Sequence, residues 1–168
     1  MSSLKREHER SRVRRLVNRY ARGSVRSTQE VRADLERRGV SSTVAARVIA
    51  ECQTLRILDD EAGARLWADQ WARCGYAWTA IHAKLSLRGF SDETIERAAK
   101  RLGTAGDDDA RARLVVAASL RRHRTRPATR WSLARTLASR GFDADLIERV
   151  LNESSGPAAD GSSSSVIL

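Results

Sequence analysis

The stretch LSLRGFSDE, residues 85–93, lies near the middle of the chain, and versions of its first six letters occur twice more. They are LERRGV at 35–40 and LASRGF at 137–142, so the three leucines are 50 and 52 residues apart. A nearly constant period of this length is typical of proteins built from repeated structural units. The sequence therefore predicts three tandem copies of one unit.

The repeated phrase reads as the end of a helix followed by a corner. A glycine in the left-handed conformation just past a helix brings the leucine four residues before it against the apolar residue after it. The three sets are Leu35, Gly39 and Val40; Leu85, Gly89 and Phe90; and Leu137, Gly141 and Phe142. An arginine precedes each glycine, where a cation favours the negative end of the helix dipole. Two residues after each glycine a new helix can begin, capped by Ser41, Ser91 or Asp143.

Apolar residues at helical spacing lie on both sides of each corner and predict one helix before it and one after it. A further helix precedes each pair. Its expected buried stripes are Val13, Leu16, Val17 and Tyr20; Ala62, Leu66, Trp67 and Cys74; and Leu114, Val115 and Ala118. We therefore expect an all-α fold of three tandem three-helix repeats in an elongated, curved array, at 4–55, 57–103 and 106–153. Residues 154–168 lack periodic apolar residues and are expected to form a flexible tail.

Polar residues mark where several of these helices begin. Acids at 59–61 and 107–109 suit the positive end of a helix, so we interpret both clusters as helix starts rather than as metal or acid–base sites. Ser27 and Glu30 have the spacing of a capping box, and Pro127 fits the first turn of the corresponding helix in the third copy.

Catalytic, metal and membrane signatures are missing from the sequence. His8, His82 and His123 are scattered, and there is no glycine-rich phosphate loop, so we predict neither an enzyme nor a cofactor nor a bound metal. Cys52 and Cys74 form no metal-binding pattern and are expected to be small buried hydrophobes. No apolar run is long enough to span a membrane, and the chain opens MSSLKREHERSRVRR without a signal sequence, which predicts a cytoplasmic location.

Positive charge is concentrated in two segments. Residues 1–26 carry nine Lys and Arg against two acids, residues 110–142 carry nine against none, and residues 27–106 have a net charge of only +1. In the second segment five arginines have no acid nearby in the sequence and are the candidate binding residues: Arg121, Arg122, Arg124, Arg126 and Arg130. Such segments favour a polyanionic or acidic partner, although a merely solvated basic face is the alternative. Trp67, Trp71, Tyr76 and Trp78 lie in the neutral middle, which argues against a platform for stacking single-stranded nucleic acid.

Residues 57–95, ILDDEAGARLWADQWARCGYAWTAIHAKLSLRGFSDETI, followed by the recurrence of LASRGF before a final helix, resemble the bacterial RecX family of recombinase regulators. The resemblance covers about residues 16–152 and is most specific at the Asp59-Asp60 pair, the turn from Arg73 to Gly75, and the threefold corner. It implies tandem three-helix repeats. It also implies a protein that binds the RecA recombinase filament along its groove and suppresses its ATPase, strand-exchange and coprotease activities.

The same resemblance implies weak binding to single- or double-stranded DNA and a contribution of Arg73 to the binding surface. From the sequence we also expect no membrane partner and a monomer. Two residues depart from the family pattern. Arg56 replaces a glycine that usually precedes the acidic pair, and Gly63 stands where a phenylalanine is expected. The alternative function is a DNA-binding module of the helix-turn-helix type that uses the basic ends, since short helices joined by tight corners also suit that role.

Overall fold

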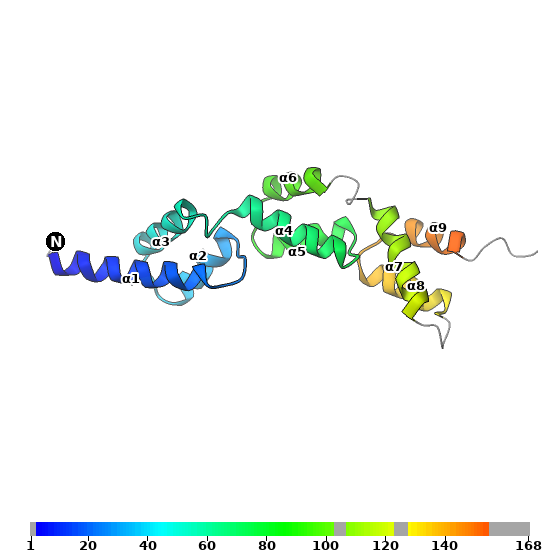
Figure 1. Ribbon diagram of the computed structural model, residues 1–168, viewed down its shortest axis with the longest axis horizontal. Helices are drawn as coiled ribbons and strands as arrows, with labels where there is room; N and C mark the ends of the chain where they lie inside the picture. The colour runs from blue at the N-terminus through cyan, green and yellow to red at the C-terminus, as the bar shows by residue number, and fades with distance from the viewer. Residues whose placement is uncertain (1–2, 103–106, 123–127, 155–168) are drawn as a thin grey trace, which may run out of the picture. The chain divides into compact units, whose positions relative to one another are not determined.

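The computed structural model describes residues 3–102, 107–122 and 128–154, and every regular element within those ranges is an α-helix (Figure 1). In chain order the helices are α1 (Ser3–Ala21), α2 (Thr28–Arg37), α3 (Ser42–Thr54), α4 (Asp60–Arg73), α5 (Trp78–Leu87), α6 (Asp92–Leu102), α7 (Asp108–Arg122), α8 (Arg130–Ser139) and α9 (Ala144–Ser154). The prediction of an all-α fold is confirmed.

By spatial contact the chain forms two compact units. The first comprises Met1–Cys74 and Ile81–Gly106, and the second comprises Gly75–Ala80 and Asp107–Leu168. The first turn of α5 therefore belongs to the second unit. The three-repeat division at 4–55, 57–103 and 106–153 stays a proposal about how the chain is organised.

The three corners share one backbone geometry. Gly39, Gly89 and Gly141 have φ of 65°, 78° and 86°, in the left-handed region that favours glycine. After each glycine, the next residue's N–H donates to the carbonyl of the leucine five residues earlier, at 3.1, 3.2 and 3.3 Å. This is the Schellman arrangement, which satisfies carbonyls that the helix end would leave without a partner. Each corner ends one helix and directs the chain into the next.

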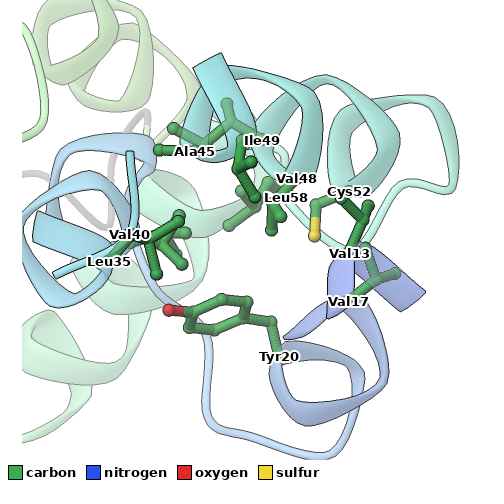
Figure 2. Close-up of a cluster of buried hydrophobic side chains, with 12 residues drawn as sticks. Val13, Val17, Tyr20, Leu35, Val40, Ala45, Val48, Ile49, Cys52 and Leu58 are labelled. Carbon is green, nitrogen blue, oxygen red and sulfur yellow. The ribbon is translucent and has the colours of Figure 1, made fainter. Parts of the chain in front are cut away.

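The first unit contains a core to which α1, α2 and α3 all contribute (Figure 2). Its buried members are Val13, Val17, Tyr20, Val31, Leu35, Val40, Val44, Ala45, Val48, Ile49, Cys52 and Leu58. The stripe predicted for 13–20 lies in this core, with Leu16 partly buried against it. The apolar positions on both sides of the corner are buried here as their spacing predicts.

The second unit has a core of its own, formed by α7, α8 and α9 together with Ala77. Its buried members are Ala77, Ala112, Val115, Val116, Leu133, Leu137, Phe142, Leu146, Ile147, Val150 and Leu151. The residues predicted to face inward on either side of the third corner are buried in it.

The predicted stripe on α4 is wrong. Ala62 and Cys74 are exposed, Leu66 is 49% exposed and Trp67 is only partly buried, whereas the buried face consists of Gly63, Ala64 and Ala68. The small residues allow α4 to pack closely against its neighbours, so this helix buries its small side chains and leaves larger ones at the surface. Cys74 is accordingly not the buried hydrophobe that we expected, although Cys52 is.

A similar correction applies to α7. Leu114 is 66% exposed and Ala118 is exposed, while Ala112, Val115 and Val116 are buried. Apolar spacing correctly identified Val115 but not Ala112 or Val116 as part of the inward face.

Four of the predicted helix starts are confirmed in detail. Asp59 accepts a hydrogen bond from the N–H of Ala62 at 2.9 Å, and Ser27 and Glu30 form the reciprocal bonds of a capping box. Ser91 accepts from the Thr94 N–H at 3.3 Å, and Asp143 accepts from the Leu146 N–H at 2.8 Å. Ser41, by contrast, makes no side-chain capping bond. Pro127 lies outside the described residues.

Candidate functional site

The second copy of the repeated phrase, at 85–90, contacts the start of α2. The buried Ser27 hydroxyl donates to the Arg88 carbonyl, and Asp60 Oδ1 accepts from the Thr28 N–H at 2.8 Å and from its hydroxyl at 3.0 Å. Gly89 lies so close that a Cβ there would be 2.8 Å from Cβ of Gln29. We call this contact the first joint.

An equivalent contact, the second joint, is formed by the third copy and the start of α5. The Ala77 N–H donates to the Arg140 carbonyl at 2.9 Å, and Asp108 accepts from the Trp78 N–H at 3.0 Å. A Cβ at Gly141 would be 2.6 Å from the Cβ of Ala80. In both joints an acid from the start of one helix caps a different helix, a role that the sequence analysis missed.

The arginines of the second and third corners, Arg88 and Arg140, contact residues outside their own helix. The prediction that the corner arginines serve mainly the helix dipole is therefore incomplete. Arg88 lies 4.1 Å from the centre of the Trp67 ring, donates to the Val25 carbonyl at 3.3 Å and approaches Glu30 at 3.5 Å. A Cβ on Gly75 would be 2.5 Å from Nη1 of Arg140. Both arginines therefore pack onto the loop that precedes the helix start in their joint.

Arg38, in the first copy, turns to its own helix instead. Its Nε donates to Asp34 at 2.9 Å, and the Tyr20 hydroxyl donates to the same carboxylate at 2.9 Å. The Arg38 hydrogen bond lowers the pKa of Asp34, opposed by burial. Burial, the Asp34 hydrogen bond and the Asp34 charge together raise the pKa of Tyr20 to about 12. This group fixes α1 to α2.

The tryptophans of α4 are engaged with cations of the same unit. Trp67 and Trp71 stack with their ring centres 5.3 Å apart, Arg88 covers the first ring, and Lys84 lies 5.7 Å from the centre of the second. Such cation–π contacts stabilise the packing of α4 against α5. These rings are therefore occupied, consistent with the argument against a base-stacking platform.

Of the candidate binding arginines in the second unit, Arg121 and Arg130 can be described. Both are exposed, and Arg130 donates to the Asn152 side chain at 2.9 Å. Within the described part of the chain neither forms an ion pair. Arg122 is the last residue of α7, but its side chain is not described. Arg124 and Arg126 lie outside the described residues. Arg73, at the end of α4 in the first unit, is exposed, with its Nε 3.3 Å from the Asp69 carbonyl.

Not every arginine of the basic segment 110–142 is available to a partner. Arg111 is 6% exposed and paired with Asp108, while Arg113 bonds to Glu153 at 2.9 Å and lies 3.7 Å from Asp109. Acids outside the segment therefore neutralise part of its charge, which counting within 110–142 could not reveal.

A stripe of arginines on α1 is the surface that sequence reasoning left unassigned. Its members, which we call the α1 stripe, are Arg12, Arg15 and Arg19 on the helix and Arg22 directly after its last residue. All four are exposed, and the spacing of the three helical arginines places them away from the buried Val13 and Val17. Among the described residues none of them is in an ion pair. The net charge of +7 over residues 1–26 was the available signal, but only the position of the buried face sorts these arginines onto one side.

A hollow of about 440 Å³ beside the first joint is also basic. It is lined by Ser24, Arg26, Glu30, Ala33, Arg37 and Arg88. Arg88 is paired with Glu30 and Arg37 with Asp34, so Arg26 is the lining arginine that has no ion pair among the described residues. The described residues contain no group of His, Cys, Asp and Glu that could hold a metal ion. None of the helices within them is long and apolar enough to cross a membrane.

These features define a class: an all-helical protein in which corner–helix joints recur and which carries exposed arginines on its surface. Comparison with known proteins identifies the family. The chain is 30% identical over 147 residues to the regulatory protein RecX of Thermobifida fusca (strain YX), a match that covers 85% of this chain and 78% of the relative. The chain belongs to the RecX family.

Solved structures agree with this assignment at the level of the fold. A crystal structure of RecX from Lactobacillus salivarius superposes with a TM-score of 0.68 at 16% identity and covers 88% of this chain and 97% of the other. A second crystal structure, of a regulatory protein RecX, gives a TM-score of 0.68 at 14% identity over 89% of this chain and 75% of the other. No model of a protein family matches the chain.

Proposed function

We propose that this protein regulates the RecA recombinase by binding its filament along the groove and inhibiting its ATPase, strand-exchange and coprotease activities, without being an enzyme itself. The observation that carries the proposal is its membership of the RecX family. Exposed arginines without acidic partners in the described residues, at the α1 stripe and at Arg121 and Arg130, support an acidic or polyanionic target. Single- or double-stranded DNA would be a weaker partner.

The repeated joints suggest how such inhibition would work. Several modest contacts on one chain act together through effective concentration, so the protein can bridge successive filament subunits with more affinity than any one contact supplies. If the bridged arrangement is one in which the subunit interface hydrolyses ATP poorly, differential affinity for that state inhibits the filament. The nucleotide itself need not be touched.

The test is the ATPase activity of RecA on single-stranded DNA, titrated with the protein and with charge variants. Replacing Arg121, Arg122, Arg124, Arg126 and Arg130 with Gln should raise the concentration for half-inhibition by about tenfold or more, since several charge contacts are lost at once. Helicity and melting should hardly change. Arg32→Gln with Arg65→Gln, two exposed arginines outside these surfaces, is the matched control and should inhibit normally.

The α1 stripe favours a second candidate, the DNA-binding module, because evenly spaced arginines on one helix face can contact a row of phosphates. Replacing its four arginines with Gln and measuring binding to naked duplex across a salt series separates the two. Loss of naked-DNA binding together with full retention of ATPase inhibition would assign the stripe to DNA and leave regulation to the second unit. If the five-arginine variant also inhibits fully, the proposed role of those arginines is wrong.

A further inference from the structure

The start of α8 corresponds to the starts of α2 and α5, each of which is covered by a corner in one of the two joints. The helices α2, α5 and α8 each have ten residues and begin eleven residues before their corner glycine. The residue just before the helix is 0% exposed in the first joint (Ser27) and 1% exposed in the second (Ala77). At α8 the equivalent residue, Thr129, is exposed.

The same difference appears in the hydrogen bonds of the first helical residue. Thr28 N–H donates to Asp60 and Trp78 N–H donates to Asp108, at 2.8 and 3.0 Å. For Arg130, which takes their place in α8, no carboxylate among the described residues accepts from the N–H. Thr129 caps the helix only through the Ser132 N–H, at 3.2 Å. A carboxylate at this place would meet the Arg130 N–H and the positive end of the helix dipole.

The side chains around this start favour a protein partner that carries an acid. Trp131 is 69% exposed and is the largest exposed apolar side chain in the described ranges, with Arg135 5.5 Å from its ring centre. Arg130 is exposed as well. An apolar ring beside unneutralised cations and a helix start fits a segment that brings both a carboxylate and an apolar contact.

A second copy of this chain does not fit the open site. Val13 and Val17 of α1 take the place of Ala64 and Ala68 of α4, which puts Glu9 where Asp60 stands. Glu9 lies inside α1 rather than at its start, and its carboxylate is paired with Arg47. The net charge of +10 also opposes self-association. The occupant is therefore a different protein.

We propose that Thr129–Ser132 forms an open joint that binds a protein segment with an aspartate or glutamate at the start of a helix, as Asp60 and Asp108 bind within this chain. The carboxylate accepts from the Arg130 N–H, and an apolar side chain of the segment packs on Trp131. This inference goes beyond the regulation of RecA and does not require RecA to be the partner.

The probe is a blocked peptide with the sequence of residues 57–68, the segment that supplies the acid of the first joint, added to the isotope-labelled full chain. Saturable shifts are expected in the amide signals of Thr129–Ser132 and in the Trp131 indole. A peptide with Asp59→Asn and Asp60→Asn should bind more weakly by about tenfold or more, because the charge-assisted bond is lost.

Two protein variants complete the test. Trp131→Glu places a repelling acid at the site and should abolish the shifts without lowering the melting temperature, since an acid in the first turn suits a helix. Leu87→Glu, at a position 88% exposed on α5, is the control and should leave peptide binding unchanged. Absence of shifts at Thr129–Ser132, equal binding of the Asn peptide, or full binding by Trp131→Glu would each overturn the proposal.

Discussion

The corners at Gly39 and Gly141 have nearly the same sequence and backbone and very different surroundings. A Cβ added at Gly39 would meet nothing within 4 Å, whereas at Gly141 it would lie 2.6 Å from the Cβ of Ala80. The first corner only ends a helix. The third also forms a joint with the copy before it. One local motif thus serves two purposes, and the difference lies in whether the start of another helix packs against the glycine.

Alanine at the two glycines should give the largest contrast. Gly141→Ala combines left-handed strain with a clash against Ala80 and should lower the free energy of unfolding by about 2–4 kcal/mol. Gly39→Ala carries the strain alone and should cost about 1 kcal/mol. Urea unfolding of both variants measures the difference. Equal losses at the two positions would show that the second joint contributes nothing at Gly141.

Of the corner arginines, Arg88, which lies in a joint, should contribute more to stability than Arg38, which does not. Arg88→Ala removes the cation over Trp67 and the bond to the Val25 carbonyl, and should cost about 1–2 kcal/mol. Arg38→Ala should cost less, because Asp34 keeps its bonds to Tyr20 and Arg37. A double-mutant cycle of Arg88→Ala with Trp67→Leu, followed by chemical unfolding, isolates the stacking contribution. Additive losses would mean that the ring and the guanidinium do not act together.

The Tyr20–Asp34–Arg38 group, which belongs to the first copy, should make stability depend on pH at both extremes. The pKa of Tyr20 is raised from 10.0 to about 12, so its stabilising contribution is full below pH 10 and is lost as the pH rises from 10 towards 12. The pKa of Asp34 is lowered from 3.8, so its contribution is present above that pH and is lost as the pH falls below it. Melting temperatures across pH should show both losses.

Tyr20→Phe is the control for the alkaline limb. The variant should be less stable at neutral pH and should lose less further stability between pH 10 and 12 than the natural protein does. An identical alkaline loss in both proteins would mean that Tyr20 is not the group responsible.

The smallest expected effect is a gain in stability. Arg56 has φ of 54°, a left-handed conformation that is costly for a side chain other than glycine. Its side chain is 84% exposed, and its Nη1 lies 3.7 Å from Asp59 Oδ2, an ion pair that contributes little. Arg56→Gly should therefore raise the free energy of unfolding by about 0.5–1 kcal/mol in thermal or urea unfolding. A destabilised variant would show that the ion pair outweighs the backbone strain.

The sequence predicted what is local and periodic. The corners were visible because only glycine suits the left-handed position and because leucine and an apolar residue flank it at fixed spacing. The inward positions of α2, α3, α8 and α9 were visible for the same reason, since large apolar residues recur on one face. Arg56 fits this pattern in retrospect: it occupies a place where the family usually has glycine, and its backbone is left-handed.

What the sequence did not predict depends on contacts between distant residues. The inward face of α4 consists of Gly63, Ala64 and Ala68, and its larger side chains misled the search for a stripe. A Cβ added at Gly63 would lie 3.1 Å from Cγ1 of Val25 and 3.5 Å from the Phe90 ring, so the aromatic ring expected from the family pattern at 63 has no space here. Asp60 and Asp108 act on other helices 32 and 30 residues away, which spacing within one helix cannot show.

The most direct test of the central claim is the affinity of the unmodified protein for RecA filaments on DNA, compared with the same DNA without RecA, at physiological salt. Regulation of the filament predicts binding to the coated DNA that is stronger by at least about tenfold and that depends less steeply on salt, because part of the contact is to protein. Equal affinity for naked and coated DNA, with the same salt dependence, would contradict the account and favour a DNA-binding module.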